Sequence, residues 1–235
     1  MEALFLHSSS PCPPSSLIFS SSRRIPVTRN LDASRIVKGR CGRPNSTSKS
    51  IAASVRESSR LARDDLLGLI ADQERGIRTI GDESKRAQIV RAIDALGDEG
   101  KDTVTTGPSL SGTWRMLWTT EKEQLFIIRN ARLFGTLAGD VLQVIDVEGR
   151  SLNNVITFPP SGVFFVRSGI QIASPQRVNF RFTSAVLRGS GWELPLPPFG
   201  QGWFESIYLD DMIRVAKDIR GDYLVVDRAP YSWKE

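Results

Sequence analysis

Hydrophobic and polar residues alternate along residues 110–119, and this alternation predicts the first strand of a β-rich region. Large apolar side chains occupy every second position there: Trp114, Met116 and Trp118. A period of two with aromatic content is typical of a strand whose two faces meet different environments. We therefore expect this stretch to open a closed antiparallel sheet.

The chain after this stretch continues as short strands separated by tight turns. Alternating or β-branched runs predict strands at 140–147, 153–158, 163–173, 177–187, 202–209, 212–216 and 223–228. About eight short strands with tight turns are typical of an antiparallel barrel or sandwich. A barrel of this size holds one small ligand or is filled by side chains, and the pattern leaves both alternatives open.

Before the opening strand the apolar period changes to that of helices. Residues 57–75 carry one stripe and residues 82–96 another, at spacings of three and four: Ala62, Leu66, Leu69, Ile70, and Ala87, Val90, Ile93, Leu96. Residues 98–109 are polar and read as a linker. Residues 121–140 lack clean alternation, so we expect a short helix or an ordered loop near one mouth of a barrel.

Residues 188–201 combine large apolar side chains with three prolines. Proline donates no ladder hydrogen bond, so this stretch cannot be a central strand, and we expect a loop. The loop either folds onto the barrel wall or serves as a lid or membrane contact, since exposed apolar patches mark interaction sites. The candidate contact residues are Trp192, Leu194, Leu196 and Phe199.

The first 52 residues differ in composition from the rest. They hold twelve Ser and eight of the 31 Lys and Arg residues, but two of the 26 acids. This composition predicts a transit peptide, and its Ser/Pro-rich start favours a plastid over a mitochondrion. The remainder carries 23 basic and 24 acidic residues, so it lacks the basic excess that nucleic-acid binding needs.

Removal of the leader would also remove the chemistry of imidazole and thiol. The single His, His7, and both Cys, Cys12 and Cys41, lie within it. The mature chain would then have no Ser-His-Asp or Cys-His catalysis, no disulfide and no zinc site of the usual N/S type. We expect a protein that is not an enzyme and that has no cofactor and no metal.

Several segments together resemble the plastid-lipid-associated protein family, also called plastid fibrillins or plastoglobulins, over about residues 60–228. The residues that carry the resemblance are Asp65-Leu66-Leu67, Arg75-Gly76-Ile77, Leu110-Ser111-Gly112-Thr113-Trp114, Trp118-Thr119-Thr120-Glu121-Lys122-Glu123, Val144-Ile145-Asp146, Leu152-Asn153-Asn154-Val155, Arg177-Val178 with Phe180 and Phe182, Gly202-Trp203-Phe204, and Tyr208-Leu209-Asp210-Asp211-Met212-Ile213-Arg214. The following tail, residues 214–223, looks more like the plastid-lipid-associated protein 8 subgroup.

The resemblance implies a lipocalin-like barrel in chloroplasts, on thylakoids or plastoglobules, that binds or organises prenylquinones, carotenoids or acyl lipids. It implies no established enzymatic activity. In lipocalin-like folds the Trp of a Gly-x-Trp closes the barrel floor under an Arg from the last strand. Gly112 and Trp114 match this signature, and of Arg214 and Arg228 we prefer Arg228.

If the barrel is hollow, inward aromatic residues line its pocket. The candidates are Trp118, Phe165, Phe180 and Phe182. Arg167 and Arg181 lie on strands, where an inward Arg could anchor a carboxylate or a quinone oxygen, although an outward Arg is commoner.

The predicted organisation is a disordered transit peptide at 1–53, a helical segment and linker at 54–109, and the barrel at 110–235. Two functions remain open: a module that binds a hydrophobic molecule, and a coat or scaffold on thylakoid or plastoglobule surfaces. No segment has the ~18 consecutive apolar residues of a spanning helix, so we expect peripheral membrane contact, with no nucleic acid and an open oligomeric state.

Overall fold

The computed structural model describes residues 46–134 and 136–235, and side chains from Glu57 onward with a gap at 133–135. Most of the expected leader, residues 1–45, lies outside the described residues. Residues 54–235 form one compact unit. The expected boundaries at 53 and 109 stay predictions.

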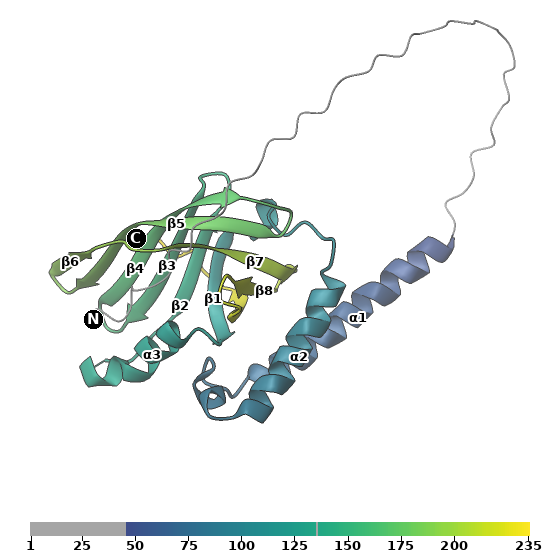
Figure 1. The fold of residues 1–235 in the computed structure, drawn as a ribbon, viewed down its shortest axis with the longest axis horizontal. Coiled ribbons are helices and arrows are strands. Elements are labelled where there is room, and N and C mark those ends of the chain that lie inside the picture. The colour runs from purple at the N-terminus through teal and green to yellow at the C-terminus, as the bar shows by residue number, and fades with distance from the viewer. Residues whose placement is uncertain (1–45, 135) are drawn as a thin grey trace, which may run out of the picture. The chain divides into compact units, whose positions relative to one another are not determined.

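Nine antiparallel strands make up one sheet (Figure 1). They are β1 (Gly112–Thr119), β2 (Val141–Asp146), β3 (Ser151–Phe158), β4 (Gly162–Ile172), β5 (Arg177–Gly189), β6 (Trp192–Leu196), β7 (Gln201–Leu209), β8 (Ile213–Asp218) and β9 (Tyr223–Arg228). The order is β4-β3-β2-β1-β9-β8-β7-β5-β6, and β4 also pairs with β5. This last pairing closes eight strands into a ring, which confirms the predicted mainly β, lipocalin-like fold.

The strand β6 corrects one expectation, because residues 188–201 are not simply a loop. Trp192–Leu196 pair with the end of β5, with Pro195 opposite Val186. In the sheet order β6 is the terminal strand, with β5 as its one neighbour among the described strands. Proline is tolerated at such an edge, where its missing N–H leaves no ladder bond unmade.

Within residues 46–134 and 136–235, three α-helices and three short 3-10 helices surround or precede the ring. They are α1 (Ser46–Ile70), η2 (Ile77–Ile80), α2 (Glu83–Glu99), η3 (Pro108–Leu110), α3 (Lys122–Asn130) and η4 (Ala131–Phe134). Asp82 caps α2, since its Oδ1 accepts a hydrogen bond of 2.8 Å from the Lys85 amide. The helix α3 occupies the stretch where the sequence predicts a short helix or ordered loop.

The turn after α1 depends on Gly76, which has φ of +110°. A Cβ there would lie 2.3 Å from the carbonyl oxygen of Thr119 at the end of β1. Only glycine accommodates both the left-handed backbone and this close approach. The turn thereby joins the helical segment to the first strand of the ring.

Alternation along the strands divides the apolar side chains between two faces. The inner cluster lies on the inner face of the ring and includes Trp114, Met116, Val141, Ile145, Leu152, Ile156, Ile170, Val178, Phe204, Ala216, Leu224 and Val226. The outer cluster joins α1 and α2 to β1, β7, β8 and β9 and includes Leu66, Ile70, Ile89, Ile93, Leu96, Trp118, Tyr208, Ile213, Val215 and Val225. The predicted helical stripes therefore face the outside of the ring.

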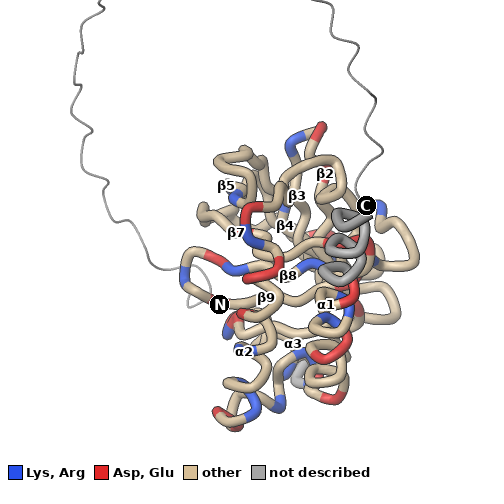
Figure 2. The backbone as a smooth tube through the Cα atoms, turned by 90° about the vertical axis from the view of Figure 1, so that its right-hand side faces the viewer, with Lys and Arg blue, Asp and Glu red and all other residues tan. Residues whose placement is uncertain are grey.

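Lys and Arg residues alternate with Asp and Glu residues along the helices and turns of the described chain (Figure 2). Several exposed pairs are ion-paired, such as Arg220 with Glu123 at 2.7 Å. Exposed pairs of this kind contribute about 0–1 kcal/mol each, so they add little to the stability of the fold.

Candidate functional site

Trp114 lies at one end of the ring, where β1 begins and β9 ends. Its side chain is fully buried, and its Nε1 donates a 2.8 Å hydrogen bond to the carbonyl oxygen of Leu110. The Arg228 guanidinium carbon lies 4.3 Å from the centroid of the indole. A guanidinium stacked on an indole contributes about 0.5–2 kcal/mol. The structure thus brings Gly112, Trp114 and Arg228 together at what we call the floor of the barrel.

Arg228 makes two hydrogen bonds to backbone carbonyl oxygens at the floor. Its Nη1 donates to the carbonyl oxygen of Ser111 at 3.1 Å, and its Nη2 donates to the carbonyl oxygen of Ser109. The pairing of Trp114 with Arg228 in the β1–β9 register fixes their contact. We conclude that Arg228 is a structural side chain of the floor.

A second arginine, Arg214 on β8, lies above the same indole. Its guanidinium carbon is 5.6 Å from the Trp114 ring and 5.3 Å from the Phe204 ring. The side chain is completely buried, and burial lowers its pKa to about 9, so it stays protonated at neutral pH. Its Nη2 donates to Gln143 Oε1, whereas Nε and Nη1 have no hydrogen-bond partner in the described part of the chain.

The contacts of Arg214 with other residues do not offset the free-energy cost of burying its charge. Desolvation of a buried ion costs several kcal/mol, and each unpaired buried donor costs about 1–3 kcal/mol more. Two cation–π contacts near the ~6 Å limit contribute at the low end of about 0.5–2 kcal/mol each. One hydrogen bond to Gln143 adds about 1.5–3 kcal/mol. The interior therefore holds a positive charge that its neighbours do not offset.

From the sequence, Arg214 is only an alternative partner of Trp114. The signal that it faces inward was present in the alternation of β8. Ile213 and Val215 belong to the outer cluster, and Ala216 belongs to the inner cluster. Arg214 shares the face of Ala216, because residues two apart on a strand point the same way.

A chain of polar side chains crosses the interior from Arg214. Gln143 accepts from Arg214 and donates through Nε2 to Asn154 Oδ1 at 3.0 Å. Gln143 pairs with Trp114 in the β1–β2 register, which places this polar layer directly beside the floor. The rest of the inner face is predominantly apolar.

The end of the ring opposite the floor, where β1, β3 and β5 end and β2, β4 and β7 begin, we call the mouth. Phe180 and Phe182 lie in the first half of β5, opposite Ile170 and Ser168 of β4. Their rings are stacked with centroids 5.4 Å apart, and Phe180 packs against the inner cluster. Both side chains are partly exposed. The mouth is further bounded by α3, whose Ile127 and Ile128 also pack against the inner cluster.

Trp118, a predicted pocket residue, does not face the interior. It is fully buried in the outer cluster beneath α1 and α2. The β1–β9 register shifts between Met116 and Trp118, and such a bulge moves the following side chains to the other face. Regular alternation after Trp114 and Met116 therefore gave the wrong face for Trp118.

Phe165, a second predicted pocket residue, also faces outward. It belongs to a separate cluster with Leu142, Val155 and Val186, and its ring centroid is 6.2 Å from that of Trp233. Its neighbour Phe164 takes the inward position against the inner cluster. Two adjacent phenylalanines offer no basis for choosing which of them faces inward.

Six apolar side chains in segments at the mouth have exposed fractions of 46–60%: Phe126, Leu137, Trp192, Leu194, Phe199 and Ile219. We call them the mouth residues. The pairing of β6 with the end of β5 and the hydrogen bond from the Phe182 amide to the Gly200 carbonyl locate this region. Leu196, the remaining candidate contact, is partly buried.

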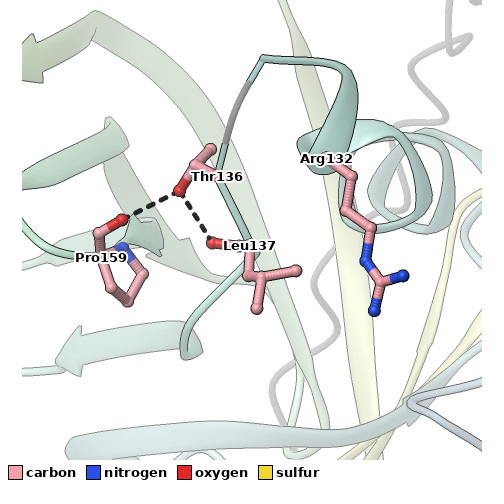
Figure 3. Close-up of a pocket in the computed structure, with 4 residues that line it drawn as sticks. All are labelled: Arg132, Thr136, Leu137 and Pro159. Carbon is pink, nitrogen blue, oxygen red and sulfur yellow. Dashed lines mark hydrogen bonds between the residues drawn. The ribbon is translucent and has the colours of Figure 1, made fainter.

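A surface pocket of about 530 Å³ lies beside the mouth, between η4 and the β3–β4 turn (Figure 3). Arg132, Thr136, Leu137 and Pro159 line it. The Thr136 hydroxyl points toward Pro159 and donates to its carbonyl oxygen at 3.0 Å. This contact ties the segment after α3 to the end of the ring.

The described residues contain no group of three or more His, Cys, Asp or Glu side chains placed to hold a metal ion. Within the same residues, no helix has both the length and the apolar character needed to cross a membrane.

Comparison with known proteins shows similarity to one family. The family model described as PAP_fibrillin matches residues 60–227. The chain is 70% identical over 174 residues to the Arabidopsis thaliana protein named "Probable plastid-lipid-associated protein 11, chloroplastic", covering 74% of this chain and 82% of that one. It is 24% identical over 191 residues to "Plastid-lipid-associated protein 6, chloroplastic" of the same species, covering 68% and 67%. The comparisons do not confirm the subgroup of protein 8, and no solved structure matches.

Proposed function

This chain belongs to the plastid-lipid-associated, or PAP_fibrillin, family, and from that premise we propose that it binds a hydrophobic molecule inside its barrel. The ligand classes are a prenylquinone, a carotenoid or an acyl lipid. The site of action is the chloroplast, at the surface of thylakoids or plastoglobules. The curated relatives are named chloroplastic, which supports this location.

The observation that carries the proposal is the contrast between the two ends of the ring. The floor is closed by the Trp114–Arg228 contact at 4.3 Å. The mouth residues leave apolar surface exposed at the other end. Ligand pockets are mostly apolar with a few polar anchors, and an apolar rim suits a molecule that enters from a lipid phase.

We propose no catalytic role. Residues 54–235 contain neither His nor Cys, so the commonest nucleophile and general-base pairs are not available to them. A binding role requires none of these groups.

A second candidate is a coat or scaffold protein that attaches to the lipid surface and binds nothing inside. The exposure of Trp192, Leu194 and Phe199 at 52%, 46% and 60% favours this candidate as well. The two candidates differ in whether a ligand binds inside the barrel.

A pair of tryptophan probes separates them. Phe180→Trp reports from the inner face and Phe165→Trp from the outer face of neighbouring strands. Titration with a short-chain plastoquinone analogue should change the emission of the Phe180→Trp variant, relative to the parent chain, and leave that of Phe165→Trp unchanged. Native mass spectrometry of protein purified from chloroplasts should then show a bound lipid-sized mass.

Equal or absent responses from both probes, together with no bound mass, would rule out the binding role. The coat or scaffold function would then remain, and vesicle co-sedimentation tests it.

A further inference from the structure

Arg214 is a buried cation whose hydrogen-bond donors are mostly unused. The side chain has no exposed surface, and its Nε and Nη1 have no hydrogen-bond partner among the described residues. An arginine side chain offers five N–H donors and no acceptor. After the bond to Gln143, four donors remain for a group that has only acceptors.

No carboxylate of the described chain faces this charge. Arg214 forms no ion pair there, and burial alone accounts for its lowered pKa. The acidic residues on neighbouring strands pair elsewhere. Asp227 on β9 pairs with Arg115 at 2.6 Å, and Glu205 on β7 pairs with Arg177 at 2.8 Å.

A second unpaired donor lies close by on β7. The Ser206 side chain is completely buried, and its hydroxyl has no hydrogen-bond partner within the described residues. Ser206 pairs with Ala216, two residues from Arg214 on the same face of β8. Diagonal neighbours of this kind are within reach of a long side chain, so one small group can contact both.

We propose that Arg214 is the anchor for the carboxylate of an acidic, otherwise apolar ligand of the long-chain fatty acid type. This inference rests on the proposed binding function and deepens it, because it selects among the hydrophobic ligand classes. Arginine binds carboxylates through short, charge-assisted hydrogen bonds. A neutral prenylquinone or carotenoid supplies no counter-charge.

The position of Arg214 also fixes the direction of the ligand. The polar layer of Arg214, Gln143 and Asn154 lies next to the floor. From there to the mouth the inner face is apolar, through residues such as Met116, Ile156 and Phe164. The carboxylate therefore lies deep and the hydrocarbon chain points toward the mouth.

The test compares a fluorescent polyene fatty acid, parinaric acid, with its methyl ester on the full chain. Both probes have the same hydrocarbon chain and differ in charge. The acid should bind at least tenfold more tightly than the ester. This comparison requires no variant, so it does not depend on whether a buried substitution folds.

Variants then assign the preference to one residue. Arg214→Gln keeps a partner for Gln143 and removes the charge, so it should lose the tenfold preference while its ester affinity is unchanged. Arg214→Lys keeps the charge and should retain part of the preference. The matched control is Arg181→Gln, which removes an exposed arginine of β5 that donates to Gln201 at 3.2 Å, and it should bind both probes as the parent does.

The outcomes are distinct. Equal affinity for acid and ester in the parent chain would overturn the Arg214 proposal and leave the binding function standing. The same holds if Arg214→Gln, shown to be folded by circular dichroism, still prefers the acid. Failure of the folded parent chain to bind either probe would overturn the anchor, and the proposed function would then stand or fall on the plastoquinone titration and the bound mass.

Discussion

At the scale of single residues, the floor of the barrel depends on one glycine and two arginines around one indole. Arg228 is satisfied by backbone carbonyls, whereas Arg214 is buried and keeps free donors. Both arginines contact Trp114, so proximity to the indole did not distinguish their roles. Their hydrogen bonds did, and these depend on the folded structure.

Gly112 makes the floor possible, and its substitution is the residue-scale prediction. Its φ is +146°, and a Cβ there would lie 2.6 Å from Nη1 of Arg228. Gly112→Ala should lower the free energy of unfolding by about 1–3 kcal/mol through backbone strain, and it should also displace Arg228. Urea denaturation measures the first effect.

Gly68→Ala is the matched control for that measurement. Gly68 is exposed on α1, with nothing within 4 Å of a Cβ. The substitution should raise stability by about 0.5–1 kcal/mol, as alanine does within an exposed helix. A Gly112→Ala protein as stable as its parent would show that the floor does not require glycine.

At the scale of elements, the sequence predicted most strands and helices near their observed positions because their apolar periods are regular. It failed where an element lacks a period or where a period is interrupted. Residues 121–140 gave no choice between helix and loop, and the structure forms α3 and η4 there. The prolines in 188–201 concealed the edge strand β6.

The start of α3 supplies a prediction about pH. Burial raises the pKa of Glu121 to about 7, and the nearby Asp218 and Asp222 act in the same direction. The folded state thus holds a proton that the unfolded state releases near pH 4.5. The free energy of unfolding should therefore fall as pH rises from about 5 to about 7.5, by at most about 3 kcal/mol at ~1.36 kcal/mol per pKa unit.

Glu121→Gln should remove this component of the pH dependence, as measured by denaturation between pH 5 and 8. The control is Glu123→Gln on the same helix, which breaks an exposed pair with Arg220 and leaves Glu121 in place. It should retain the slope. A Glu121→Gln protein with the slope of its parent would contradict the assignment to Glu121.

At the scale of the whole molecule, the closed ring separates three environments: an interior, an outer face covered by α1 and α2, and a mouth with exposed apolar side chains. The mouth residues come from separate segments of sequence: α3, the loop after η4, β6, the 197–200 loop and the β8–β9 turn. The sequence marked only the segment at 188–201 as a contact, because the others become neighbours through closure of the ring.

The mouth should attach the protein to lipid, and vesicle co-sedimentation tests this. Insertion of a large apolar side chain contributes about 1.5–3 kcal/mol, so Trp192→Ser with Phe199→Ser should weaken attachment at least tenfold. Attachment of the parent chain should also resist high salt, because apolar insertion is not screened.

The control replaces two exposed apolar residues at the floor end, Ile172→Ser with Met212→Ser, which are 43% and 53% exposed. This variant should bind vesicles as the parent chain does. If the two double variants behave alike, or if salt releases the parent chain, the mouth is not the attachment surface.

The sequence by itself determined the mainly β fold, the two preceding helices and the family, because local periods and short motifs encode these features. Tertiary structure decided which aromatic side chains face the interior. Trp118 faces outward because of a bulge in β1, and Phe165 faces outward because of the register of β4. Alternation shows which side chains share a face, but the register decides which face is inside. Tertiary structure also isolated Arg214, since only the closed ring shows a buried charge without a counter-charge.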